Sequence, residues 1–228
     1  MAERLRVDLG CGNAKRPGYV GLDYVEGDDV DHVLDLTTDR YPFDDGTVEA
    51  VFSAHFLEHI DEPNHVFGEI GRICADGALI EFYTPYAWTN EAWLYGHVHG
   101  ITEEMWTHLG LSHREAYADI LGGRWLLRRF VFVIDEATLV DLDANGVQLD
   151  FALRYYQNVV REFGVEVEFR RDLDVPEVGP ERVYATSRFG ERRPTWSRPV
   201  PTRSVVRTSL SRLKRSLVRA PSRGADVR

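Results

Sequence analysis

The stretch Val7-Asp8-Leu9-Gly10-Cys11-Gly12 is a short apolar strand pattern that ends in Gly-x-Gly. Such an ending brings backbone N–H groups close to a ligand, because neither glycine has a Cβ to hold the ligand away. A second predicted strand, residues 19–23, ends at the acid Asp23. A carboxylate at that point can accept hydrogen bonds from two ribose hydroxyls. Together the two strands predict an α/β fold with a nucleotide-type site.

No third glycine follows at dinucleotide spacing, since residues 13–16 are Asn, Ala, Lys and Arg. Residues 7–12 instead resemble motif I of the class I S-adenosylmethionine (SAM) dependent methyltransferases, of the methyltransferase type 11 kind. Over residues 5 to about 188 the resemblance implies a Rossmann-like fold. That fold has a mostly parallel seven-stranded sheet, helices on both faces and a lid insertion after strand 5. The interval from Gly12 to Asp23 leaves room for a turn and not for a full first helix.

The resemblance also implies SAM as cofactor and assigns its contacts. Asp8 faces the methionine ammonium directly or through water, Asp23 accepts the ribose hydroxyls, and Asp35 faces the adenine amino group. For Asp35 a solvated turn acid is the alternative, and Cys11 is expected to be a small packing residue. The expected cofactor-binding set is Asp8, Gly10, Cys11, Gly12, Asp23, Asp35, Leu36, Ser53 and His55.

Apolar runs and turn signals predict the remaining elements. A helix is expected from Asn64 to the stop at Asp76-Gly77, and another over residues 149–163. Residues 125–134 fit either an extra strand or an apolar lid element. The remaining predicted strands cover residues 30–36, 48–53, 78–84, 165–171 and 181–187, the last two as a closing antiparallel pair.

Residues 86–135 form the expected lid. They contain Trp88, Trp93, Trp106 and Trp125, four of the five tryptophans, and flat rings of this kind stack on sugar faces. The segment from His97 to Glu104 resembles a His-containing loop in the branch of the family linked to polysaccharides and sugars, although Leu94-Tyr95-Gly96 replaces the expected Asp-Pro-Thr step.

A histidine with a near-neutral pKa can take the proton of an acceptor hydroxyl. We expect this catalytic role of His97 first, and then of His55 and His99. Buried, hydrogen-bonded histidines that shape the lid are the alternative. His97 and His99 also alternate like a metal pair, but no third ligand sits at recognisable spacing, so no metal site is predicted.

Composition bounds the class of protein. The 228 residues are 43% hydrophobic, contain two cysteines without metal-ligand spacing, and have no apolar run long enough to span a membrane. We expect one methyltransferase domain over residues 1–189 in a reducing cytoplasm. The oligomeric state is not predicted.

Charge separates this domain from the tail at residues 190–228. Residues 191–228 hold eleven Lys and Arg against two acids, a charge of +9, so the total of −10 leaves −19 for residues 1–190. An acidic body repels nucleic acid phosphates. Leu210, Leu213 and Leu217, with Val206, form a basic amphipathic stretch that suits peripheral contact with the inner membrane surface. A disordered tail, or one folded back on the acidic body, is the alternative.

The leading hypothesis is therefore methyl transfer from SAM to an acceptor hydroxyl, on a sugar or surface glycan. One alternative is a non-catalytic SAM-binding module whose basic tail binds membrane or nucleic acid. The other is a small-molecule N- or C-methyltransferase, because the fold does not choose the acceptor atom.

Overall fold

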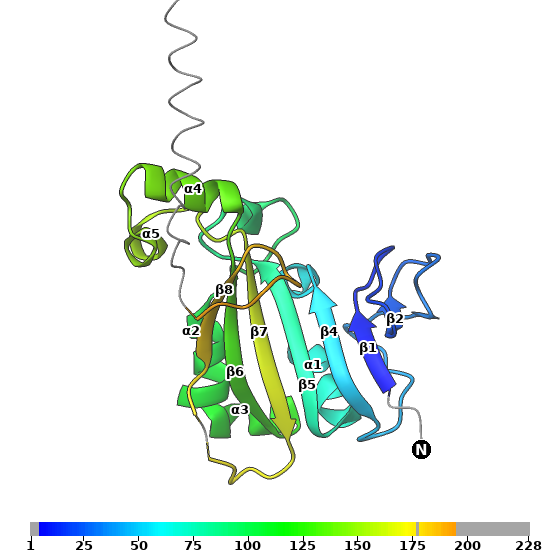
Figure 1. The fold of residues 1–228 in the computed structure, drawn as a ribbon. Helices are drawn as coiled ribbons and strands as arrows, with labels where there is room; N and C mark the ends of the chain where they lie inside the picture. The colour runs from blue at the N-terminus through cyan, green and yellow to red at the C-terminus, as the bar shows by residue number, and fades with distance from the viewer. Residues whose placement is uncertain (1–4, 177, 195–228) are drawn as a thin grey trace, which may run out of the picture. The chain divides into compact units, whose positions relative to one another are not determined.

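The structure, a computed structural model, describes residues 5–176 and 178–194. The chain divides into two units, Met1–Thr195 and Trp196–Arg228, and the predicted amphipathic stretch of the tail lies outside the described residues. The first unit contains one eight-stranded sheet in the order β3-β2-β1-β4-β5-β7-β6-β8 (Figure 1). Its strands are β1 (Leu5–Leu9), β2 (Val20–Asp23), β3 (His32–Val33), β4 (Val48–Ala54), β5 (Cys74–Pro85), β6 (Arg124–Val133), β7 (Glu162–Arg170) and β8 (Glu181–Ala185).

The first five strands of the sheet are parallel, as predicted. β1 lies between β2 and β4, so the chain leaves β1 toward one edge and later returns on its other side. In open α/β sheets such a reversal opens a ligand crevice at the carboxyl ends of the strands. Turns and loop connect β1 to β2, which confirms that no helix fits there.

Several predictions for the strands and for the helix over residues 149–163 were wrong. The sheet has eight strands instead of seven, and residues 124–133 form β6 inside it, which agrees with the strand alternative for residues 125–134. β7 and β8 are not a closing pair, since β7 pairs antiparallel and β8 parallel with β6. The helix predicted over residues 149–163 ends at Tyr155, and β7 begins at Glu162. The strand predicted over residues 30–36 shrinks to two residues.

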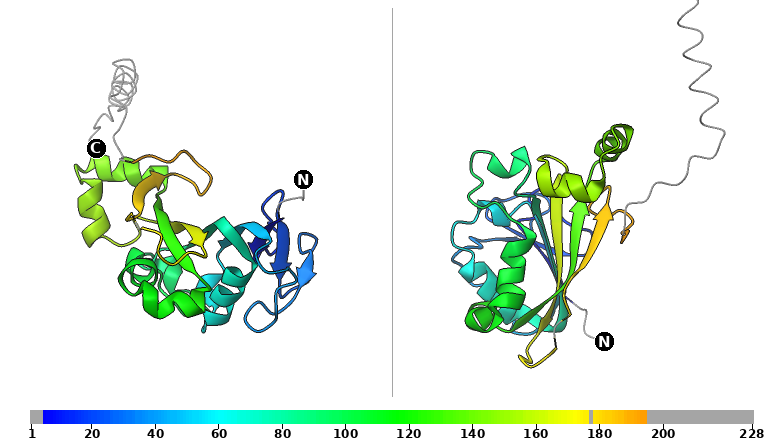
Figure 2. Two further views of the ribbon diagram at one scale, coloured as in Figure 1. Left: turned by 90° about the horizontal axis from the view of Figure 1, so that it is seen from below. Right: turned by 90° about the vertical axis from the view of Figure 1, so that its left-hand side faces the viewer.

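The main helices lie on one face of the sheet, as Figure 2 shows. They are α1 (Asn64–Ile73), α2 (Glu103–Thr107) and α3 (Arg114–Leu121). Under them Phe82 stacks with Trp106 and Trp125 at centroid distances of 5.2 and 6.0 Å. These two tryptophans are therefore core residues and not sugar platforms. The predicted stop at Gly77 lies inside β5, because α1 already ends at Ile73.

The opposite face of the sheet has apolar residues of its own. Phe52, Tyr83 and Val131 form an apolar cluster there. Phe189 packs on Phe52 with the two ring centroids 5.9 Å apart. The remaining helical elements are η1 (Leu57–His59), η2 (Asn90–Trp93), the π-turn η3 (His108–Ser112), α4 (Glu136–Ala144) and α5 (Leu149–Tyr155). In the described part, no helix is long and apolar enough to cross a bilayer.

The close approach of α1 and α3 gives a test of the packing. A Cβ on Gly71 of α1 would lie 2.0 Å from the backbone oxygen of Leu121, whereas one on Gly68 would make an ordinary 3.5 Å contact with Ile120. We expect Gly71→Ala to lower the free energy of unfolding by about 1–3 kcal/mol through overpacking. Gly68→Ala, one turn away, should be neutral or stabilising because alanine favours the helix. Urea unfolding of both variants measures this, and equal effects would contradict the packing described.

Candidate active site

A cavity of about 470 Å³ opens where β1, β2 and β4 end. It brings together five of the nine residues predicted for cofactor binding, Gly10, Asp23, Asp35, Leu36 and His55. Asp8, Cys11, Gly12 and Ser53 do not line it. The other lining residues, which the sequence did not single out as cofactor contacts, are Tyr24, Thr37, Phe56, His59 and Ile60.

The glycine turn after β1 forms the floor of this pocket. Gly10 has a φ of +67°, and a Cβ there would lie 2.8 Å from the Phe56 side chain. Gly12 also has a positive φ, and its N–H donates to Asp23 Oδ2 at 2.9 Å. The other oxygen of Asp23 accepts the N–H of Val25 at 3.0 Å. Each carboxylate oxygen retains a lone pair for a ligand hydroxyl.

Asp8 lies beneath the turn and is 2% exposed. Its Oδ2 accepts the backbone N–H of Arg16 at 2.7 Å. Burial raises the pKa of this carboxyl to about 6, against the partial opposing effect of the Arg16 hydrogen bond. A cationic group placed beside Asp8 favours its charged form. Asp8 does not line the cavity, so its contact with the methionine ammonium stays a prediction.

Cys11 and Ser53 are buried next to the glycine turn and do not line the pocket. The Ser53 hydroxyl donates to the Leu9 backbone oxygen at 3.0 Å and ties β4 to the end of β1. Cys11 is buried, and burial raises the pKa of its thiol to about 11. A neutral thiol is a poor nucleophile, which agrees with the packing role predicted for Cys11.

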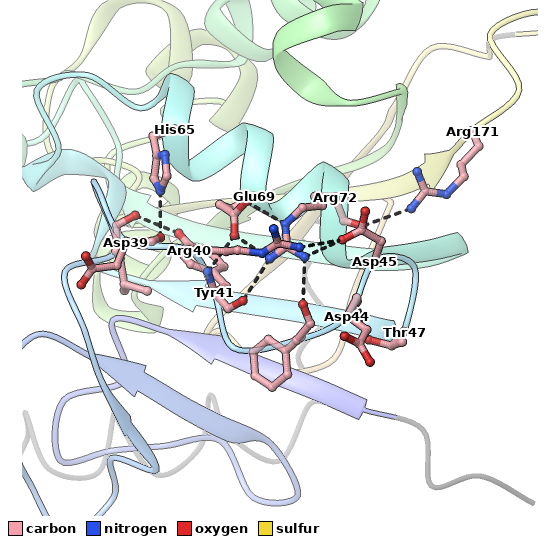
Figure 3. Close-up of polar contacts among 12 residues, drawn as sticks. Asp39, Arg40, Tyr41, Asp44, Asp45, Thr47, His65, Glu69, Arg72 and Arg171 are labelled. Atoms are coloured by element: carbon pink, nitrogen blue, oxygen red, sulfur yellow. Dashed lines mark hydrogen bonds and ion pairs between the residues drawn. The ribbon is translucent and has the colours of Figure 1, made fainter.

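Asp35 and Leu36 reach the pocket from the loop that follows β3. Asp35 Oδ1 accepts both the N–H and the hydroxyl of Thr37, and mainly the hydroxyl bond lowers its pKa. Leu36 is held through its backbone oxygen, which accepts the Tyr41 hydroxyl at 3.1 Å. In Figure 3 the next part of the loop wraps around Arg72 of α1, whose guanidinium donates to Tyr41 O at 3.0 Å and Phe43 O at 2.8 Å. Helix α1 thus anchors one wall of the pocket.

His55 follows β4 with a φ of +55°, which is rare for a residue with a side chain. Its ring nitrogens face two buried carboxylates, Glu58 at 3.2 Å and Glu162 at 2.9 Å. The hydrogen bond to Glu162, and then that to Glu58, raise the pKa of His55 to about 9. His55 therefore holds its proton at neutral pH, so action as a base requires that these contacts first weaken. No local pattern points to Glu162, which lies 107 residues away.

The other two predicted catalytic histidines lie near the pocket but do not line it. His99 contacts the backbone oxygen of Asp61 through Nε2 at 3.1 Å. His97 packs against His59 with ring centroids 4.6 Å apart. His59, which sequence reasoning treated mainly as a turn-orienting residue, is the histidine of this pair that lines the pocket.

Sequence comparison agrees with this geometry. Residues 7–82 match the methyltransferase domain family. The match runs from β1 through most of β5 and contains every residue that lines the pocket. The methyltransferase domain takes its methyl group from SAM, so SAM is the cofactor. No curated protein sequence matches the chain.

The fold is similar to that of a solved methyltransferase. A SAM-dependent methyltransferase from Archaeoglobus fulgidus has a TM-score of 0.52 at 14% identity, over 73% of this chain and 86% of that one. A methyltransferase of Haloferax volcanii, solved with its Trm112 activator, has a TM-score of 0.45 at 20% identity, over 73% and 83%. Geranyl diphosphate C-methyltransferase from Streptomyces coelicolor A3(2) has a TM-score of 0.41 at 18% identity, over 73% of this chain and 74% of that one. At such identities the likeness concerns the fold and not the acceptor.

The Asp8 carboxyl gives a pH-dependent test. In the folded protein its pKa of about 6 exceeds the ordinary aspartate pKa of 3.8. The contribution of Asp8 to stability is therefore complete below about pH 4 and is lost as the pH rises through about 6. Asp8→Asn should remove this part of the pH dependence. S-adenosylhomocysteine, whose homocysteine ammonium corresponds to the methionine ammonium of SAM, should lower the Asp8 pKa. Carboxyl-carbon NMR measures both, and an unliganded midpoint near 4 would contradict the buried position.

Proposed function

We propose that the protein transfers the methyl group of SAM to a hydroxyl of a sugar or glycan. In this reaction the acceptor oxygen attacks the methyl carbon in line with the carbon–sulfur bond. The bonding electron pair passes to sulfur, which leaves neutral S-adenosylhomocysteine, and the hydroxyl proton passes to a base. Proximity and alignment in the pocket supply much of the acceleration.

One observation supports the choice of acceptor. It is an exposed loop, residues 93–98, which we call the aromatic loop and which is held at the rim of the cofactor pocket. Trp93 is 72% exposed and Tyr95 is fully exposed. The N–H of Val98 donates to the Glu58 backbone oxygen at 2.8 Å, and His59 Nδ1 lies 3.1 Å from Gly96 O. These two bonds fix the loop to η1, which borders the pocket. Exposed flat rings beside a methyl donor suit stacking on a sugar face.

The aromatic loop predicts a specific kinetic change. Trp93→Ala and Tyr95→Ala should raise the KM for a glycan acceptor about two- to ten-fold, as expected for the loss of 0.5–1.5 kcal/mol of ring contact. The affinity for S-adenosylhomocysteine should stay unchanged. Tyr155→Ala on α5, which removes an equally exposed ring, serves as the matched control.

Turnover is followed as S-adenosylhomocysteine formed from SAM with pools of sugars, oligosaccharides and amines. Turnover with the sugar pools that is sensitive to Trp93 or Tyr95 supports the proposal. Turnover with amines alone identifies an N-methyltransferase instead. Cofactor binding without turnover in any pool identifies a non-catalytic binding module.

A further inference from the structure

Three side chains gather beside the cofactor pocket, Glu58 and His59 of η1 and His97 of the aromatic loop. One possible ligand atom from each lies within 4.8 Å of the other two. Glu58 is 1% exposed, His97 is half-buried and His59 is exposed. The Val98–Glu58 backbone hydrogen bond brings these segments together across nearly 40 residues of sequence.

Two buried atoms of this group have no hydrogen-bond partner, Glu58 Oε2 and His97 Nδ1. Glu58 Oε1 contacts His55, so Oε2 is the carboxylate oxygen left over. Burial of a carboxylate oxygen removes its hydration, and nothing in the described part of the chain replaces it. Both residues of this group therefore have a buried polar atom left to bind a further group.

His59 is oriented so that it can supply a third donor. Its Nδ1 lies 3.1 Å from the Gly96 carbonyl oxygen, which only accepts hydrogen bonds. Nδ1 therefore carries the proton, and Nε2 keeps a free lone pair. A histidine that binds metal is commonly fixed in this way, by an outer hydrogen bond from its other ring nitrogen to a carbonyl.

We propose that Glu58, His59 and His97 bind one divalent transition-metal ion. Two imidazoles with one carboxylate suit the zinc, iron or cobalt class better than magnesium or calcium, which prefer oxygen ligands. Ligands about 2.1 Å from one ion lie roughly 3–3.5 Å apart, so binding draws the three ligand atoms, which lie within 4.8 Å of one another, closer together. In the sequence, His97 and His99 alternate like a metal pair. In the structure His99 contacts Asp61, and His97 packs against His59 instead.

The position of this group also suggests a use for the ion. His59 lines the cofactor pocket, and three protein ligands leave coordination positions open. A hydroxyl oxygen bound at such a position loses its proton to solvent more readily. This use, which rests on the proposed methyl transfer, takes the place of a free-base role for His97. Binding of the ion does not depend on the reaction.

The test is metal titration of the full chain without an affinity tag, after treatment with a chelator. We expect Co²⁺ to bind at one equivalent with ligand-field absorption, and Zn²⁺ to displace it. His59→Ala and His97→Ala should each weaken binding about 100-fold or more, since loss of even an outer partner costs 10–100-fold. Glu58→Gln should weaken binding to a similar extent if this variant folds. If it does not fold, the two histidine variants still test the proposal.

His99→Ala is the matched control, because His99 lies two residues from His97 and outside the group. It should bind Co²⁺ like the original chain. Absence of stoichiometric binding, or binding that survives both His59→Ala and His97→Ala, would overturn the proposal. Titration of S-adenosylhomocysteine into the same metal-free protein separates this failure from failure of the cofactor site.

Discussion

The Asp23 carboxylate joins the two strand ends on which the site depends. One oxygen holds the N–H of Gly12 and the other holds the N–H of Val25, so the glycine turn after β1 and the turn after β2 are fixed together. The pocket forms between these turns and the end of β4. A residue that binds both turns and faces the cavity couples the shape of the site to its chemistry.

Arg16, a few residues beyond the glycine turn, extends this constraint to the face of the sheet opposite α1, α2 and α3. Its backbone N–H binds Asp8, and its guanidinium contacts Glu81 at 2.6 Å and lies 4.7 Å from the Phe52 ring centroid. Where a full first helix is lacking, Arg16 and the segment around Phe189 cover the apolar cluster on this face. The segment that carries Gly10 into the pocket lining thus also completes the core.

Local patterns in the sequence predicted the parallel half of the fold and much of the pocket. Val7 to Gly12, Asp23 and the start of α1 follow from strand, turn and helix signals within a few residues. The pairing of β7 and β8 with β6 could not be predicted from such local signals. An apolar run such as residues 125–134 fits a strand or a lid equally well until its neighbours are known. The contact between His55 and Glu162 was missed for the same reason, since it depends on β7 lying beside β5.

We propose that the crevice beyond β1, β2 and β4 binds SAM through Asp23. Calorimetric titration of S-adenosylhomocysteine into the full chain, Asp23→Ala and Asp23→Asn tests it most directly, with Glu26→Ala as an acidic control outside the pocket lining. We expect one binding site for S-adenosylhomocysteine in the original chain and in Glu26→Ala. Both Asp23 variants should bind at least ten-fold more weakly, a loss of roughly 1.5–3 kcal/mol. Absence of binding to the original chain, or equal binding by all four proteins, would contradict the account.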